Sequence, residues 1–256
     1  MDKREGKDRI AGYREFLKDS IRKKVDFSHT DQNQGAVTPS PQKDISPEKE
    51  IIKLSEMGDW PSVKSIDLVE AIAARKSRRK YLDVPLMLDE LAFLLWATQG
   101  VKSLTHGHTY RTVPSAGCRH SFETYLCVIN VKGLDQGIYR YLPLDKALVC
   151  EHKVDNISTR ISKASLGQVF TGDASVTFIW TTIPYRMEWR YGMAAHKAIA
   201  IDIGHVCQNL YLTCEAIDSG CCAIGEYDQV MMDSLIDVDG KDEFVIYMAS
   251  VGKVKK

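Results

Sequence analysis

One helical run constrains the possible folds more than any other feature of this sequence. From Arg190 to Ser219, small and apolar residues recur on nearly every face of a helix of about 30 residues. Such a helix is roughly 45 Å long, about the width of a domain of this size. It must be buried on nearly every side, while Asp202, His205 and Glu215 argue against lipid as the cover. We therefore expect protein to cover this helix, including a second subunit.

Composition and charge exclude several classes of protein. The 256 residues can form one large domain or two small ones, and Lys+Arg and Asp+Glu both number 34. With zero net charge, the chain as a whole does not attract nucleic acid or an anionic membrane surface. The sequence has no apolar stretch of about 18 residues, so we expect no membrane span. The charged start, MDKREGKDRI, lacks the apolar segment of a secretory signal.

The seven cysteines resemble neither a disulfide framework nor a zinc finger, because their number is odd and no Cys-x-x-Cys occurs. We expect reduced, mostly buried thiols and a cytoplasmic protein, and we interpret the adjacent Cys221 and Cys222 in the same way. Zinc could in principle be bound by four residues near one loop, but their spacing is irregular, so we predict no metal site. These residues are His106, His108, Cys118 and His120.

Two regions differ in composition. Residues 1–60 form an N-terminal helix, expected over Ile10–Val25, followed by an extended arm. The arm, His29 to Pro47, is rich in Gln, Asn, Ser, Thr and Pro, so it cannot build a core. It is predicted either to be disordered or to wrap a partner subunit. Residues 61–256 have regular periodicity and form the second, main domain.

The main domain reads as α+β, because helices and short strands alternate without a βαβ rhythm. One helix begins near Ile66 with Asp67 and Glu70 in the capping-box relation. Further elements follow from period, composition and turn residues. Helices are expected from Pro85 to Gly100, over 155–168 and near Met231, and strands over 124–131, 137–142, 175–183, 221–225 and 243–251.

The first helix runs into a basic turn. The run Arg75 to Tyr81, RKSRRKY, offers five cations and one hydroxyl within seven residues. The sequence contains neither Gly-x-G-x-x-Gly nor a Walker motif, so a nucleotide phosphate would have to be held by arginine and lysine. A solvated helix C-terminus explains the same cations, because they complement the helix dipole. The run alone leaves both interpretations open.

A second segment, Pro114-Ser115-Ala116-Gly117, precedes a strand. Its small side chains allow a backbone to approach a flat ligand closely, although an ordinary tight turn has the same composition.

Several phrases together resemble the nitroreductase family of FMN proteins, over roughly Ile66 to Lys256. Arg-x-Ser-x-Arg followed by an aromatic residue is similar to that family's phosphate-binding pattern. PSAGCRHSFETYLCV, GIYRYLPLDKALV and WRYGMAAHKAIAIDIGHVCQNLYLTCEAIDSGCCAIGEYD resemble its SagB-type subgroup, which includes azoline-oxidising dehydrogenases. The resemblance implies a nitroreductase-like fold: a central mixed sheet flanked by helices in an intertwined homodimer with two interfacial FMN sites.

The resemblance also implies roles for single residues. The phosphate and ribityl chain would be held by Arg75, Ser77 and Arg79, with Lys76 nearby and Lys253 completing the phosphate site. The Pro114–Gly117 segment of the other subunit would line the isoalloxazine ring. The backbone near flavin N5 would be that of Ala223, Ile224 and Gly225.

The sequence departs from the azoline oxidases at Arg190-Tyr191, where they have Lys-Tyr. Arginine stays protonated and is a poor base, whereas Tyr191 can still donate a proton. Arg190 and Tyr191 are tentative catalytic residues. Their departure from the azoline oxidases favours an FMN-dependent oxidoreductase that uses NADH or NADPH to reduce a flat small molecule such as a nitroaromatic, quinone or enone. Two alternatives stay open: a SagB-type dehydrogenase of a peptide azoline or other biosynthetic intermediate, and a non-catalytic flavin-binding module. The alternative interpretation of Arg190 is that it merely starts the long helix.

Overall fold

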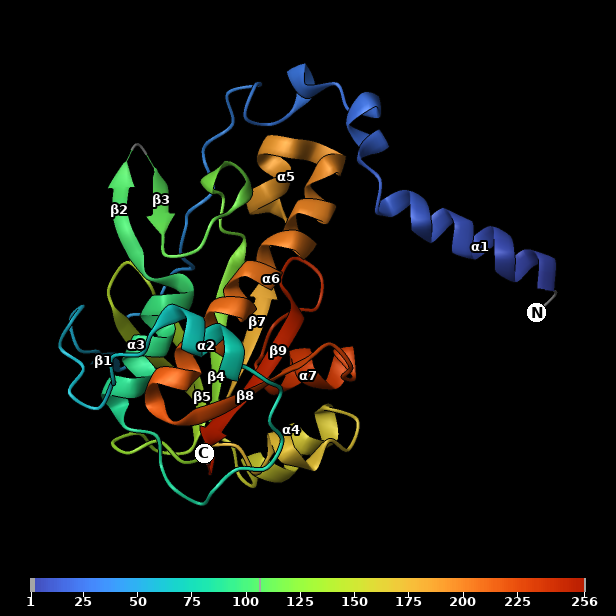
Figure 1. Ribbon diagram of the computed structural model, residues 1–256. Coiled ribbons are helices and arrows are strands. Elements are labelled where there is room, and N and C mark those ends of the chain that lie inside the picture. The colour runs from blue at the N-terminus through green and yellow to red at the C-terminus, as the bar shows by residue number, and fades with distance from the viewer. Residues whose placement is uncertain (1–2, 106, 256) are drawn as a thin grey trace.

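The computed structural model, which describes residues 3–105 and 107–255, is built around a seven-stranded sheet (Figure 1). Every pair of neighbouring strands is antiparallel, and short parallel bridges join Ser77 to Cys221 and Leu86 to Val131. Helices cover both faces, so the predicted α+β class with a mixed sheet is confirmed. The strand order is β1 (Ile51–Lys53), β6 (Ala147–His152), β5 (Gly137–Leu142), β4 (Phe122–Val128), β7 (Val176–Thr182), β9 (Phe244–Lys253) and β8 (Ser219–Ile224).

The central strand β4 shows why the sheet is buried on both faces. Its side chains alternate between two apolar clusters. Leu126 and Val128 pack in the cluster that includes α3 (Leu88–Gln99) and α6 (Ala195–Cys214). Tyr125 and Cys127 pack in the other cluster, under α4 (Ile157–Ala164) and α7 (Gln229–Leu235). All seven residues of β4 are therefore buried.

The predicted single helix over Arg190–Ser219 is wrong. The chain forms α5 (Tyr185–Tyr191), a short 3-10 turn over 192–194, and then α6. Gly192 has φ 50° and ψ −135°, a backbone conformation that no α-helix accepts, so α5 ends there. One side of α6 is covered by this chain, whereas Ala200, Ile201 and Gly204 are exposed. Cover by a second subunit stays a prediction.

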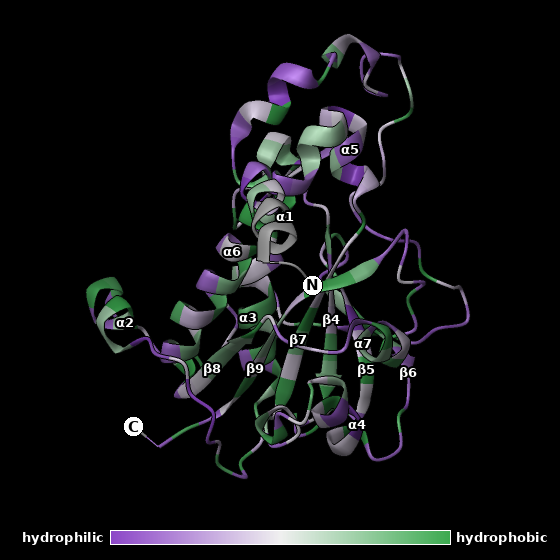
Figure 2. Cartoon of the chain, turned by 90° about the vertical axis from the view of Figure 1, so that its right-hand side faces the viewer, coloured by the Kyte–Doolittle hydropathy of each residue, from purple (hydrophilic) through white to green (hydrophobic). Residues whose placement is uncertain are grey.

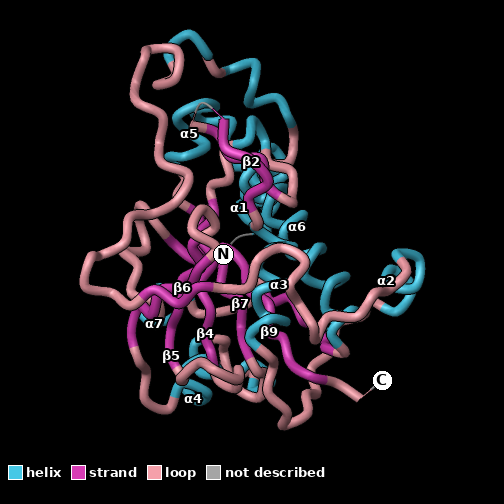
Figure 3. The backbone as a smooth tube through the Cα atoms, turned by 90° about the vertical axis from the view of Figure 1, so that its left-hand side faces the viewer, coloured by secondary structure: helices cyan, strands magenta, loops and turns pink. Residues whose placement is uncertain are grey.

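Helix α2 (Leu68–Ala74) stands away from the body of the chain (Figures 2 and 3). The Asp67 side chain accepts hydrogen bonds from the backbone N–H groups of Val69 and Glu70, which explains where the helix begins. Only Ala71 is buried, and Leu68, Val69 and Ile72 are exposed by 63%, 73% and 57%. The helix thus presents an uncovered apolar face.

The N-terminal region consists of a helix, a 3-10 segment and a strand that joins the sheet of the same chain. Helix α1 (Lys3–Phe16) projects from the body (Figure 1) and ends nine residues before the expected boundary at Val25, with a 3-10 segment over 19–24. After the arm, β1 adds to β6 with Ile51 opposite Val149. Two further strands, β2 (Val101–Thr105) and β3 (His108–Arg111), form a separate hairpin.

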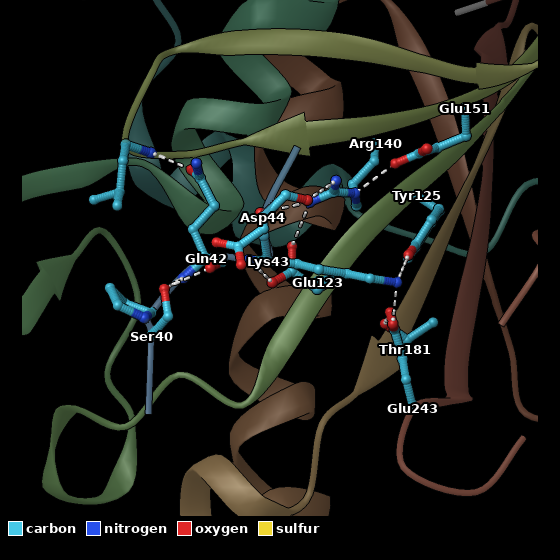
Figure 4. A network of polar contacts seen from close by, with 12 residues as sticks. Ser40, Gln42, Lys43, Asp44, Glu123, Tyr125, Arg140, Glu151, Thr181 and Glu243 are labelled. Carbon is cyan, nitrogen blue, oxygen red and sulfur yellow. Dashed lines mark hydrogen bonds and ion pairs between the residues drawn. The ribbon is translucent and has the colours of Figure 1, made fainter. Parts of the chain in front are cut away.

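A buried polar network fastens the arm to the sheet (Figure 4). The Glu123 carboxylate accepts hydrogen bonds from Arg186 at 2.6 Å and from the backbone N–H of Lys43 at 2.9 Å. Arg140 donates to the Lys43 carbonyl at 3.1 Å and to Glu151 at 2.6 Å. Because these charges are buried and paired, removal of one partner leaves another charge uncompensated.

No helix in the described part of the chain is long and apolar enough to cross a membrane.

Candidate functional site

The basic turn continues the sheet beyond β8. Helix α2 ends at Ala74, Ser77 forms the parallel bridge to Cys221, and the Arg78 N–H donates to the Cys221 carbonyl at 2.9 Å. Gly220 makes room for this packing, since a Cβ atom there would lie 2.7 Å from the Arg78 side chain. The basic turn is therefore fixed against the sheet edge instead of being a freely solvated helix end.

A tyrosine that the sequence did not single out joins two predicted parts of the site. The Ser77 hydroxyl lies 2.9 Å from the Tyr211 hydroxyl, which also accepts the backbone N–H of Ala223 at 2.8 Å. The Arg75 guanidinium lies over the Tyr211 ring, 5.3 Å from its centroid. Burial raises the pKa of Tyr211, so its hydroxyl stays protonated and can serve both neighbours. Tyr211 thus connects the basic turn to the end of β8.

Charge distribution in the basic turn fits a phosphate group. Arg75, Lys76 and Arg79 form no ion pair with any described carboxylate, and all three are exposed or half-exposed. Arg79 lies 5.7 Å from the Phe170 ring centroid. Three unpaired cations and the Ser77 hydroxyl are donors of the kind that bind phosphate oxygens.

Lys253 differs from these three cations. Its Nζ lies 2.5 Å from Glu90 Oε1 and donates to the Ile217 carbonyl at 2.7 Å. Glu90 is buried and also accepts the Met87 N–H through its other oxygen. The charge of Lys253 is therefore matched within the protein, and the structure does not bring its ammonium group into the set of unpaired cations.

The segment Ala223-Ile224-Gly225 ends β8. The Ile224 side chain is buried in the cluster beneath α7, so only its backbone is offered to a ligand on the opposite side. Cys222 precedes the segment; burial raises the pKa of its thiol, with nearby Arg79 lowering it in part.

The Pro114–Gly117 segment is attached to α6 through Asp202. The backbone N–H of Ala116 donates to the Asp202 carboxylate at 3.0 Å, and the Ser115 hydroxyl accepts the His120 N–H at 2.9 Å. Burial raises the pKa of Asp202, while hydrogen bonds from Ser115 and Ala116 lower it and offset part of that effect. These contacts hold the segment against the helix.

The structure also brings the turn together with both tentative catalytic residues. Gly117 has φ 59°, and a Cβ there would lie 2.6 Å from the Tyr191 hydroxyl and 2.8 Å from Arg190 Cδ and Nε. Cys118 and His120 also have positive φ, of 56° and 47°. Three left-handed residues among four indicate a strained turn of the kind that gathers at functional sites. Because Gly117 has no side chain, Arg190 and Tyr191 of the same protomer can approach its backbone closely.

Within one chain the two halves of the candidate site lie on opposite faces of α6. Asp202, which holds the Pro114–Gly117 turn, and Tyr211, which holds Ser77, are nine residues apart. Nine residues correspond to a rotation of about 180° and an advance of roughly 14 Å along a helix. The two segments therefore do not line one common pocket in a single protomer.

No group of three metal-ligating side chains occurs among the described residues. His108 Nδ1 accepts a hydrogen bond from Arg119 Nη1, 3.0 Å away, and His106 lies outside the described residues. Burial, together with nearby Arg111, lowers the pKa of His120 to about 3, so its imidazole is neutral.

Comparison with known proteins gives one family. The family model described as "Nitroreductase family" matches residues 72–253. A relative from Methanocaldococcus jannaschii, named as a candidate nitroreductase, is 28% identical over 193 residues, covering 75% of this chain and 94% of the relative.

Solved structures share the fold. A candidate nitroreductase from Ralstonia eutropha superposes with a TM-score of 0.66 at 24% identity, over 86% of this chain and 96% of that one. A chain of the E. coli microcin synthetase complex, solved with a truncated precursor bound, gives a TM-score of 0.58 at 18% identity, over 94% of both chains.

Proposed function

This chain belongs to the nitroreductase family, and we propose that it is an FMN-dependent oxidoreductase that uses NADH or NADPH to reduce a flat small molecule. The observation that carries the proposal is the Ser77–Tyr211–Ala223 connection, which joins the basic turn to the end of β8. A phosphate and an adjoining ring system need such a combination of charge and exposed backbone.

When bound, FMN supplies two-electron hydride chemistry. Arg75, Lys76 and Arg79 would hold its phosphate, with Ser77 on the phosphate or ribityl oxygens. The backbone of 223–225 would face the ring and tune its electron affinity through an amide donor. Lys253 would join the phosphate site only by leaving Glu90.

The opposite placement of Asp202 and Tyr211 on α6 supports a site shared between two copies of the chain. In such a homodimer, the Pro114–Gly117 turn of one protomer would complete the site begun by the basic turn of the other. The exposed stripe of α6 and the apolar face of α2 supply surface for that association. Residues 61–256 would form the FMN-binding domain, and residues 1–60 an added helix and arm.

We assign to Tyr191 the donation of a proton to a reduced substrate. Its hydroxyl lies at the Gly117 turn, where the ring would rest, and Arg190 lies beside it. For a nitro group the balanced reaction converts NAD(P)H, one proton and R–NO₂ into NAD(P)⁺, R–NO and water. Nicotinamide and acceptor would use the same open face in turn, which explains the lack of a dinucleotide-binding Gly-x-Gly-x-x-Gly.

An anaerobic experiment tests this function. FMN-loaded protein should lose its yellow colour when NADPH or NADH is added, and a nitroaromatic or quinone should restore it. Persistent yellow colour with both nicotinamides, under conditions in which dithionite bleaches the protein, would sink the reductase proposal and leave the flavin-binding module.

A SagB-type dehydrogenase is the second candidate, supported by the Tyr191 hydroxyl at the turn. That reaction needs a base to remove a proton as hydride leaves, and Arg190 does not supply one. Bleaching of the flavin by a thiazoline or oxazoline peptide, with no bleaching by NADPH, would favour this candidate.

A further inference from the structure

The Arg190–Tyr191 corner carries positive charge that the proposed reaction leaves unused. Arg190 is half-buried, and among the described residues its hydrogen-bond partner is the neutral Gln32 side chain, whose Oε1 lies 3.4 Å from Nη1. Its guanidinium also lies 5.5 Å from the Tyr191 ring centroid. Arg190 makes no ion pair with any carboxylate in the described ranges, 3–105 and 107–255.

A second arginine reinforces this charge from beneath. Arg119 is 3% exposed, donates to the Arg186 carbonyl at 2.9 Å and lies over the Trp189 ring at 4.8 Å. Burial lowers the pKa of Arg119, and the charges of Arg190 and Arg186 lower it further, which indicates that like charges crowd together here.

The carboxylates on the flanking segments form no hydrogen bond or ion pair with Arg190, because each has another described partner. They are Glu123 with Arg186 at 2.6 Å, Glu188 with His196 at 2.7 Å, Asp31 with Tyr185 at 2.7 Å, and Asp202 with the Ala116 N–H at 3.0 Å.

The N-terminal arm forms the outer wall of the corner. The Gln32 N–H donates to the Trp189 carbonyl at 2.9 Å, so the arm is fixed to α5. Arg22 lies 5.8 Å from the Tyr191 ring centroid, and its charge is paired with Asp19 at 2.9 Å. Gln32 thereby limits where the Arg190 side chain can point.

We propose that Arg190, backed by Arg119 and oriented by Gln32, binds a carboxylate on the substrate, so that the reaction selects flat anionic molecules over neutral ones of the same shape. The inference rests on the proposed function, since it assumes that the ring lies at the Gly117 turn. Arg190 is then a substrate-binding residue, and Gln32 and Arg119 are positioning residues.

Direct binding tests the proposal without turnover. FMN-loaded protein is titrated with benzoate and with benzamide, its planar neutral counterpart, and the flavin absorbance and the heat of binding are followed. A charge-assisted hydrogen bond should make benzoate bind roughly ten- to hundredfold more tightly. That advantage should shrink as salt rises from about 0.01 M to about 1 M, because the screening length falls from about 30 Å to about 3 Å. Equal binding of the two ligands at low salt would overturn the proposal.

Variants locate the effect. Arg190→Gln should abolish the preference and Arg190→Lys should keep part of it. Gln32→Ala should weaken it by raising KM for para-nitrobenzoate more than for para-nitrobenzamide. The matched control is Lys153→Gln, which removes an exposed cation paired with Asp135 and should leave the preference unchanged. A preference that survives in Arg190→Gln would contradict the assignment.

The two proposals fail in distinguishable ways. Flavin that nicotinamides never bleach contradicts the reductase, while the benzoate titration still reports on the corner. Flavin that bleaches normally in a protein with no preference for benzoate contradicts only the anion site.

Discussion

The hydroxyl of Ser77 lies 2.9 Å from the hydroxyl of Tyr211, although the two residues are separated by 134 positions in the chain. Because Tyr211 also accepts the Ala223 N–H, one phenol determines the spacing between the basic turn and the end of β8. Tyr211→Phe keeps the ring under Arg75 and removes only the hydroxyl. We expect a loss of about 1–2 kcal/mol in the free energy of unfolding, since the Ala223 N–H loses its acceptor, and weaker FMN binding. Urea unfolding and fluorescence titration with FMN measure the two effects.

The control for this change is Tyr13→Phe, since Tyr13 is 73% exposed on α1. It should alter neither quantity. FMN affinity in Tyr211→Phe equal to that of the unaltered protein would mean that the connection does not shape the site.

Gly117→Ala should reduce turnover more than it reduces stability. The residue has φ 59°, so alanine costs roughly 1–2 kcal/mol of folding free energy, and its methyl group displaces the Tyr191 hydroxyl and Arg190. Gly133→Ala is the matched control, because Gly133 has φ 93° with nothing within 4 Å of an added Cβ. We expect the two variants to have similar urea midpoints and only Gly117→Ala to lose kcat. Equal kcat values for the two variants would contradict a role for the contact of Gly117 with Arg190 and Tyr191.

Asp202 gives a pH dependence with a defined sign. Its folded-state pKa lies above the ordinary value of 3.8, mainly because burial disfavours the charged carboxylate. The native state therefore binds its proton more tightly, and Asp202 lowers stability as pH rises from about 4 through the folded pKa. Asp202→Asn keeps an acceptor for Ala116 and removes this loss. The stability of the variant relative to the original protein should increase between pH 4 and pH 7 in urea unfolding; a constant difference would refute the assignment.

Substitution of Glu123 should lower the folding free energy more than most other single substitutions in the arm network. Glu123→Gln leaves buried Arg186 without its carboxylate, while Arg140 keeps Glu151, and the change should cost about 3 kcal/mol of folding free energy. The arm should also be cleaved faster in limited proteolysis, because the Lys43 N–H loses a charged acceptor. Asp135→Asn, in an exposed pair with Lys153, should cost far less, because water already screens that pair. Comparable losses in the two variants would show that the network does not fasten the arm.

Local signals in the sequence predicted much of the fold. Asp67 marks the start of α2, and the β-branched and aromatic run before Asn130 forms β4. The break at Gly192 was missed, because helical periodicity continues through it and only its backbone angles reveal the turn. Strand β1 was missed as well, since three residues become a strand only where β6 offers an edge.

The candidate site was predicted less completely. Arg190 and Tyr191 lie against the Gly117 turn, because the end of α5 packs on that turn. Tyr211 was not identified, because a tyrosine in an apolar helix is more often a core residue than a connector. In the sequence, Asp202 indicates only that lipid does not cover the helix, and the Lys253–Glu90 pair joins residues 163 positions apart. Such long-range pairing leaves no local trace in a sequence.

The affinity of FMN relative to riboflavin tests the central claim most directly, because the two differ only by the phosphate. Equilibrium binding to the purified full chain should favour FMN by roughly a hundredfold or more, since two or three arginine or lysine contacts recognise the phosphate. In the Arg75→Gln, Arg79→Gln double variant that ratio should fall to within about tenfold, while riboflavin affinity changes little. Equal affinities for FMN and riboflavin in the unaltered protein, or a ratio that survives the double substitution, would contradict a phosphate site at the basic turn.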